Sequence, residues 1–221
     1  MDILIVRHGE SLGNAEGRIQ GHADSPLTEK GRRQAAQLGR WLALQGLKWH
    51  AAYASPLARA KDTAAIIAAT TGFADATIDD DLKEVGVGHL EGLTRTQIGG
   101  KHPDFLRRDI TSLGDFGEFG GETYDGVQER VARVRARLEQ AHRATEDRIL
   151  LVAHGGFNFQ FVKAAACIPV PRVCLLHWGN CTATLLRFRE RRGSYFADVA
   201  WHVPTELMGG ESGEGSNRVF R

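Results

Sequence analysis

Two short apolar runs that each end in a His-Gly pair are the feature that most constrains how this chain can fold. Residues 2–6 (Asp-Ile-Leu-Ile-Val) stop at Arg7-His8-Gly9, and residues 149–153 (Ile-Leu-Leu-Val-Ala) stop at His154-Gly155-Gly156. Runs of this length and composition are typical of strands that are buried on both faces of a sheet. Because such strands need helices on both sides, the two runs predict an α/β fold around a largely parallel sheet.

Helix signals separate the strand signals along the chain. Thr28 can cap a helix that ends near Gly46, and Ser55-Pro56 introduces an alanine-rich helix. The predicted helices cover 28–46, 57–70, 123–144 and 157–167, and further strand-like runs cover 51–54, 77–78, 181–188 and 195–203. This alternation predicts a three-layer sandwich in which helices flank a mostly parallel central sheet.

The region of about 85–121 differs from the rest of the chain. It is rich in glycine and lacks a long periodic segment, which predicts a small lid insertion over the site. The remainder of 1–208 is expected to form one domain, since 221 residues can bury a sizeable core without disulfides. Residues 209–221, rich in Gly, Ser and Glu, are expected to be a flexible tail.

Three groups of side chains receive a structural interpretation. The arginines interleaved along the predicted helix 123–144 are interpreted as a solvated face: Arg130, Arg133, Arg135 and Arg137. The cysteines are interpreted as buried thiols: Cys167, Cys174 and Cys181. The histidines outside the two corners show no His-x-x-x-His spacing, so neither a metal site nor another cofactor is expected.

Charge and hydropathy exclude several classes of partner. The chain has 28 Lys plus Arg against 27 Asp plus Glu, and a net charge of +1 gives no general attraction to nucleic acid or to an anionic membrane. No apolar run approaches the roughly 20 residues that span a bilayer, and the start lacks the basic head of a signal peptide, so a cytoplasmic location is expected. An anionic ligand therefore has to be bound by local positive charge.

Such a local charge is predicted at the carboxyl ends of the strands, where ligands bind in open α/β sheets. His8 and Arg7 follow one strand, His154 follows another, and Arg59 follows the Ser55-Pro56 turn. Arginine suits phosphate because its planar fork donates two parallel hydrogen bonds to the oxygens and keeps its charge. A neutral imidazole is a competent nucleophile near pH 7. These residues predict a small phosphorylated ligand and a nucleophilic histidine.

Glu84 is the best candidate for an acid near this site. It follows the strand-like Thr77-Ile78, although a glutamate beside Lys83 is typical of a protein surface. A carboxyl group held next to a bound anion is favoured in its protonated form and can donate a proton to a leaving alkoxide.

These residues belong to a longer, ordered series of short motifs that extends from about residue 2 to 190. The series comprises Arg7–Ser11 with Asn14, Gly17–Gly21, Asp24–Thr28 with Gly31, Gln34-Ala35, Ser55–Leu57 with Arg59-Ala60, Thr63-Ala64, Glu84, Glu91–Thr94, Gly121–Thr123 and Ala153–Gly156. It resembles the signature of the histidine phosphatase superfamily, in its phosphoglycerate-mutase-like branch.

The resemblance implies an α/β sandwich fold and metal-independent hydrolysis of a small phosphorylated metabolite. It implies that His8 is the phosphorylated nucleophile and that Glu84 is the proton donor. It also implies a phosphate pocket made of Arg7, Asn14, Gln20, Gly21, Arg59, His154 and Gly155.

Two alternatives within and beyond this family stay open. Mutases of the family carry a longer insertion, with a paired arginine before a proline-rich stretch that binds the carboxylate of phosphoglycerate. Here Arg107-Arg108 is followed by Asp-Ile-Thr-Ser at 109–112, which favours a phosphatase over a cofactor-dependent phosphoglycerate mutase. Arg107-Arg108 is a candidate contact for a second anionic group of the substrate or a solvated pair. A non-catalytic phosphate-binding regulator is disfavoured because the complete set of residues is present, and a homodimer is left open.

The phenylalanines of the predicted lid have two interpretations. They either shape a pocket for the organic part of the substrate or pack in a core: Phe105, Phe116 and Phe119.

Overall fold

The computed structural model describes residues 1–221 except 74, 108–114, 146, 169–175 and 209–221. Its central layer is a six-stranded sheet in the order β3-β2-β4-β1-β5-β6. The strands are β1 (Asp2–Arg7), β2 (Ala51–Ala54), β3 (Thr77–Ile78), β4 (Arg148–Ala153), β5 (Ala183–Arg191) and β6 (Ser194–Val203). The first four in this order pair in parallel, whereas β5 is antiparallel to β1 and β6 to β5. The prediction of a mostly parallel sheet is confirmed.

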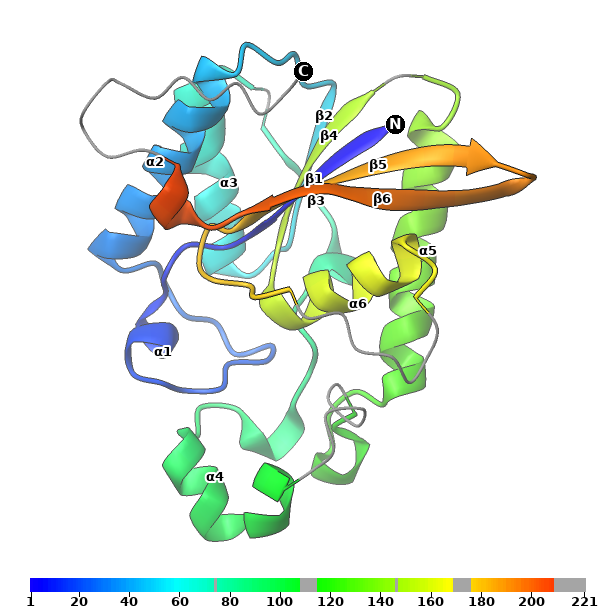
Figure 1. The fold of residues 1–221 in the computed structure, drawn as a ribbon. Coiled ribbons are helices and arrows are strands. Elements are labelled where there is room, and N and C mark those ends of the chain that lie inside the picture. Colours follow the sequence, from blue (N-terminus) through cyan, green and yellow to red (C-terminus); the bar gives the residue numbers. More distant parts are fainter. Residues whose placement is uncertain (74, 108–114, 146, 169–175, 209–221) are drawn as a thin grey trace.

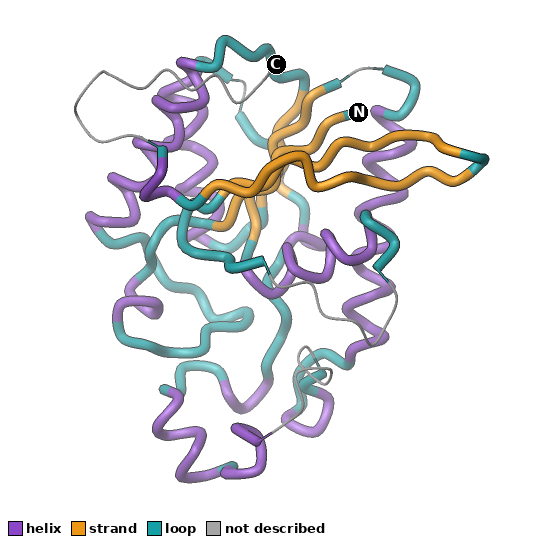
Figure 2. Tube along the Cα trace, in the orientation of Figure 1, coloured by secondary structure: helices purple, strands orange, loops and turns teal. Residues whose placement is uncertain are grey.

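Helices cover both faces of this sheet (Figure 1). The α-helices of the described chain are α1 (Leu12–Ala15), α2 (Glu29–Leu44), α3 (Ala58–Thr71), α4 (Arg95–Lys101), α5 (Tyr124–His142) and α6 (Gly155–Ala165). Helices α2 and α3 lie on one face and α5 and α6 on the other, which gives the three-layer sandwich (Figure 2). No helix among the described residues combines the length and the apolar character needed to cross a membrane.

Strand β1 shows why a continuous apolar run is needed. Ile3 and Ile5 point into the core that α5 and α6 share with the sheet, whereas Leu4 and Val6 point into the core with α2 and α3. All four side chains are fully buried. Successive residues of a strand face opposite sides, so a strand covered on both sides must be apolar at every position.

The start of α2 is packed against the loop that follows β1. Thr28 caps the helix by accepting a hydrogen bond from the Gly31 N–H at 3.0 Å, as predicted. A Cβ atom on Gly31 would lie 2.0 Å from the Glu10 carbonyl oxygen, so only glycine allows this approach. The loop carrying the first His-Gly corner is thereby held against a helix.

The described residues of the segment 85–121, which exclude 108–114, lie below the sheet in Figure 1 and include α4 and short 3-10 helices. The 3-10 helices of the described chain are η1 (Asp80–Leu82), η2 (Gly88–Leu90), η3 (Pro103–Arg107), η5 (Gly117–Phe119) and η6 (Thr205–Leu207). This segment has its own apolar cluster of buried side chains, called here the lid cluster: Val87, Leu90, Ile98 and Phe119. Among its described residues the longest helix is the seven-residue α4, in keeping with the lack of a long periodic pattern in the sequence.

Two of the structural interpretations need correction. Cys181 is buried as predicted, but Cys167, just after α6, is exposed, and Cys174 lies outside the described residues. Along α5, Arg133 and Arg137 are solvent-exposed, whereas Arg130 is only 7% exposed.

The interpretation of a solvated face is therefore wrong for Arg130, and also for the half-buried Arg135. Arg130 is covered by the residues between η1 and Gly86, and Arg135 bonds the carbonyls of Ala164 and Tyr195. An amphipathic stripe shows which side of a helix faces the main core, but not which other segments cover its polar side.

Candidate active site

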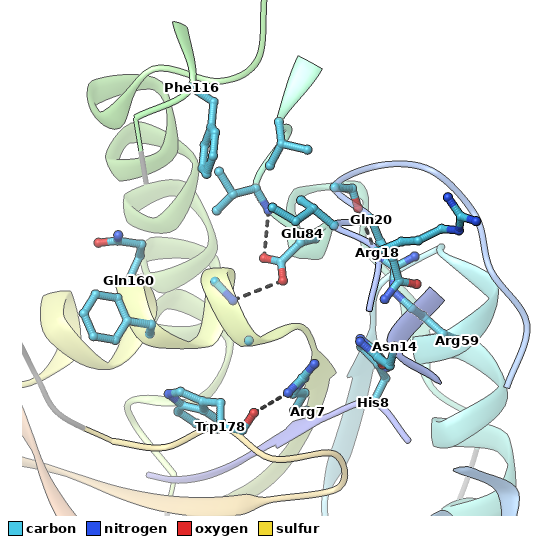
Figure 3. Close-up of a pocket in the computed structure, with 17 residues that line it drawn as sticks. Arg7, His8, Asn14, Arg18, Gln20, Arg59, Glu84, Phe116, Gln160 and Trp178 are labelled. Atoms are coloured by element: carbon cyan, nitrogen blue, oxygen red, sulfur yellow. Dashed lines mark hydrogen bonds between the residues drawn. The ribbon is translucent and has the colours of Figure 1, made fainter. Parts of the chain in front are cut away.

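A cavity of about 460 Å³ lies where the parallel strands end (Figure 3). Its lining includes all but one of the described residues that were predicted for the site: Arg7, His8, Asn14, Gln20, Gly21, Arg59, Glu84 and Gly155. His154 is the exception: it is fully buried and bonds Arg59, which does line the cavity. The side chain of Arg107 and the whole of Arg108 lie outside the described residues, so their predicted contact stays a prediction.

His8 is held in a defined tautomer. Its Nδ1 lies 2.7 Å from the carbonyl oxygen of Gly9. A carbonyl can only accept, so Nδ1 carries the proton and Nε2 keeps its lone pair. Burial, followed by the charges of Arg7 and Arg59, holds the pKa of His8 well below its usual value, and the side chain is only 2% exposed. The ring is therefore neutral at pH 7, with Nε2 available as a nucleophile.

His154 has the opposite tautomer. Arg59 donates from Nε to its Nδ1 at 3.2 Å, so the proton is on Nε2, which donates to Ser55 Oγ at 2.8 Å. The ring is fully buried, and its centroid lies 5.1 Å from that of His8. Burial, with the charges around it, lowers the pKa of His154 well below the usual value. Both nitrogens of this second corner are engaged by other side chains.

Two guanidinium groups supply the positive charge of the site. Arg7 donates from Nη1 to the Trp178 carbonyl, and its buried Nε has no hydrogen-bond partner among the described residues. Arg59 is 1% exposed and donates to the carbonyls of Ala23 and Gly21 at 2.8 Å each. Burial lowers the pKa of both arginines.

No ion pair between described residues includes either of these arginines. Buried cations that lack an anionic partner are costly, and an orphaned donor such as Arg7 Nε adds to the cost. This end of the cavity is therefore suited to an anion that accepts several hydrogen bonds.

The Glu84 carboxylate lies at the N-terminus of α6. Its Oε1 accepts from the Phe157 N–H at 2.9 Å and from the Val85 N–H at 2.8 Å, and its Oε2 accepts from the Gly156 N–H at 3.1 Å. Free N–H groups at a helix start attract negative charge. A Cβ on Gly156 would lie 2.6 Å from Glu84 Oε1, so the second glycine of the His-Gly-Gly corner makes room for the carboxylate.

The other end of the cavity was predicted only in part, through the lid phenylalanines. It is walled by apolar side chains together with Gln160, while Arg18 lies at the opposite rim in Figure 3. The apolar members are Ile19, Val85, Val87, Phe116, Phe159 and Trp178. Phe116 had been singled out as a pocket candidate and Ile19 belongs to the Gly17–Gly21 motif, whereas the others come from segments that share no local pattern.

Each of the two interpretations of the lid phenylalanines is correct for part of the set. Phe116 lines the cavity, whereas Phe105 and Phe119 pack edge-to-face in the lid cluster with ring centroids 5.5 Å apart.

The sequence did not reveal two residues that hold the loop after β1, which carries His8, in position. Asn180 donates to the His8 carbonyl and to Asn14 Oδ1, at 3.1 Å each. Thr63 Oγ1 accepts from the Gly9 N–H at 3.0 Å. The Thr63-Ala64 motif gave a signal for the second contact, whereas a lone asparagine near residue 180 gave none.

The fold is that of a known class of proteins. The model of the histidine phosphatase superfamily (branch 1) matches residues 3–197, and the chain belongs to this family. The expected resemblance is confirmed.

Relatives in this family carry different activities in their names. The chain is 36% identical over 156 residues to a metal-independent phosphoserine phosphatase of Arabidopsis thaliana, a match that covers 70% of this chain and 64% of that relative, just under two thirds of its length. It is 32% identical over 205 residues to a probable phosphoglycerate mutase GpmB of Salmonella paratyphi A, covering 93% of this chain and 92% of the relative.

Among solved structures, a mycobacterial glucosyl-3-phosphoglycerate phosphatase in complex with VO3 superposes with a TM-score of 0.78. It is 28% identical, and the match covers 90% of this chain and 96% of that one.

Proposed function

We propose that the protein is a metal-independent phosphomonoesterase that hydrolyses a small phosphorylated metabolite through a phosphohistidine on His8. The observation that carries this proposal is the neutral His8, its Nε2 unprotonated, beside two buried guanidinium groups that pair with no described carboxylate. The relatives named as phosphatases support the same reaction class.

In the first step, His8 Nε2 attacks phosphorus, and an N–P bond forms as the P–O bond to the leaving group breaks. Arg7 and Arg59 bind the non-bridging oxygens and offset the charge that spreads over them. Protonated Glu84 transfers its proton to the leaving oxygen, so the organic product departs as an alcohol.

In the second step, water attacks the phosphorus of the phosphohistidine. The N–P bond breaks, its electron pair returns to His8 Nε2, and Glu84 accepts the proton of the water. Inorganic phosphate leaves, and both residues return to their starting forms. The remaining residues proposed to bind phosphate oxygens are Asn14, Gln20, Gly21, His154 and Gly155.

His154 has a specific part in this proposal. Its Nε2–H donates to Ser55 Oγ, and because this N–H is fixed in the plane of the imidazole, the proposed contact with phosphate requires the ring to rotate until Nε2–H points at a phosphate oxygen. Until then, His154 orients Arg59 by accepting its Nε–H.

Hydrolysis is preferred to mutase activity because Arg107-Arg108 is not followed by the proline-rich stretch expected of a phosphoglycerate mutase. A mutase is the second candidate, since a relative that this chain matches over nearly its whole length is named as a probable mutase.

The test measures phosphate release, with excess chelator present, from an aryl phosphate, phosphoserine and 3-phosphoglycerate. The variant His8→Ala is compared with His50→Ala, which removes a histidine just before β2, at the amino ends of the parallel strands and away from the cavity. Chelator-resistant release that His8→Ala abolishes and His50→Ala retains supports the proposal.

Release retained by a folded His8→Ala protein would contradict it. Absence of release from every compound would also contradict it, and isomerisation of 3-phosphoglycerate would then distinguish a primed mutase from a non-catalytic regulator.

A further inference from the structure

Arg130, a buried arginine of α5, bonds both the segment that carries Glu84 and the side chain of Glu122. Arg130 Nη1 donates to the carbonyls of Asp81 and Lys83 at 2.8 and 2.7 Å, and Nη2 donates to the carbonyl of Glu84 at 3.3 Å. Its Nε and Nη2 also bond the two carboxylate oxygens of Glu122, at 2.9 and 2.6 Å. All five N–H donors of an arginine are thus used in one place.

Glu122 bonds the same segment at its C-terminal end, at Gly86. While Arg130 bonds its two oxygens, Oε2 also accepts from the Gly86 N–H at 2.8 Å. Partial burial raises the pKa of Glu122, but the bonds from Arg130 and Gly86 outweigh this and lower it, so the carboxylate is ionised at neutral pH. Residues 81–86, called here the Glu84 loop, are therefore bonded on both sides of Glu84 by one ion pair.

The Glu84 loop and the start of α6 meet at Glu84. Its carbonyl accepts from Arg130 and from His22 Nε2, the latter at 2.8 Å, while its carboxylate accepts from the N–H groups of Gly156 and Phe157. The Phe157 ring packs against the guanidinium, with Cζ 5.4 Å from the ring centroid. Arg130 thus contacts both structures that set the position of the Glu84 carboxylate.

We propose that Arg130 and Glu122 are positioning residues for proton transfer: by fixing the Glu84 loop against α6, they hold the Glu84 carboxyl where it reaches the leaving oxygen. This inference rests on the proposed role of Glu84 as the proton donor. Neither residue lines the cavity, so neither is proposed to touch the substrate.

The geometry requires arginine. A lysine ammonium is a point charge with three donors, and it cannot bond three carbonyls and two carboxylate oxygens at once. Removing the guanidinium leaves buried carbonyls unsatisfied and lets the Glu84 loop relax. A displacement of about 1 Å in a reacting group can cost about a hundredfold in rate.

The test measures kcat/KM for phosphate monoesters whose leaving groups range from nitrophenolate to simple alkoxides. A protonated leaving group matters most for alkoxides, so loss of a positioned acid steepens the dependence of rate on leaving-group pKa. We expect Arg130→Gln and Glu122→Gln to slow alkyl esters about tenfold to a hundredfold and nitrophenyl esters less than about threefold.

Arg133→Gln is the matched control. Arg133 lies on the same helix, but it is exposed and bonds only the side chain of Asp81 in the Glu84 loop, with Nη2 3.0 Å from Oδ1. This variant loses the same charge and is expected to keep the wild-type leaving-group dependence.

Glu84→Gln separates failure of this inference from failure of the proposed function. If Glu84→Gln steepens the leaving-group dependence and neither Arg130→Gln nor Glu122→Gln does so, the positioning role is overturned while the acid stands. If Glu84→Gln does not steepen it, both are overturned. Should Arg130→Gln fail to fold, Glu122→Gln decides, because glutamine keeps an oxygen for the Gly86 N–H.

Discussion

The two His-Gly corners have nearly the same sequence context, yet the structure gives their histidines different surroundings. Each follows an apolar strand, and these two strands, β1 and β4, are adjacent in the sheet. His8 bonds only a main-chain carbonyl through Nδ1, whereas His154 bonds two side chains, Arg59 and Ser55. The hydrogen-bond partner, rather than the strand, decides which nitrogen keeps its lone pair.

This difference indicates that the histidines of the two corners have different roles. The first presents an unprotonated Nε2 at the cavity, and the second holds an arginine in place from behind. Two similar local sequences can therefore acquire different functions from neighbours that are distant in the chain.

The largest expected difference between the two corners is which of their histidines carries the phosphoryl group. After rapid quenching with a radiolabelled monoester, we expect the wild type and His154→Asn to retain an acid-labile, alkali-stable label and His8→Asn to retain none. Of the two corner histidines, only His8 has an unprotonated ring nitrogen that no described side chain bonds, since His154 Nδ1 accepts from Arg59. Label on a folded His8→Asn protein, or its loss in His154→Asn alone, would reverse the assignment.

The two corners should resemble each other in their effect on stability at low pH. Both histidines have a pKa well below 6.5 in the folded state, so both are neutral when folded and take up a proton on unfolding below pH 6.5. The contribution of these histidines to the free energy of unfolding is therefore complete above pH 6.5. It falls as the pH drops from 6.5 towards the folded-state pKa, by up to about 1.4 kcal/mol per pH unit for each histidine.

Urea unfolding between pH 7 and 5 measures this slope. We expect His8→Ala and His154→Ala each to have a shallower slope than the wild type. Equal slopes in all three proteins would show that folding lowers the pKa of neither histidine.

The smallest expected effect concerns Ser55, which belongs to the second corner only. Ser55→Ala removes the acceptor of the His154 Nε2–H and should lower kcat/KM about threefold to tenfold, since a hydrogen bond of this kind contributes about 1 kcal/mol. The His8 label should be unaffected. A loss as large as that of His8→Ala would mean that the serine acts directly on the substrate.

The sequence predicts the strands, helices and loops that carry this site better than the contacts between the side chains within it. The apolar runs, the caps and the Gly-rich corners are local patterns, and they predict the sheet, the flanking helices and the place of His8 and Glu84. The tautomers depend on atoms of Gly9, Ser55 and Arg59, whose distances follow only from the folded chain.

Arg130 shows the same limit. Its position on the polar side of an amphipathic helix indicated solvent, but the Glu84 loop, about fifty residues earlier, covers it. Periodicity describes one helix at a time, so contacts made by a second segment are invisible to it.

The lid cluster has an evolutionary consequence. Val87 belongs to it, Ile19 and Phe116 pack against it, and all three also line the apolar end of the cavity. Substitutions at these positions can reshape the apolar wall of the cavity while leaving β1, β4 and the residues proposed to bind phosphate unchanged. The architecture thus allows the two ends of the cavity to vary independently of each other.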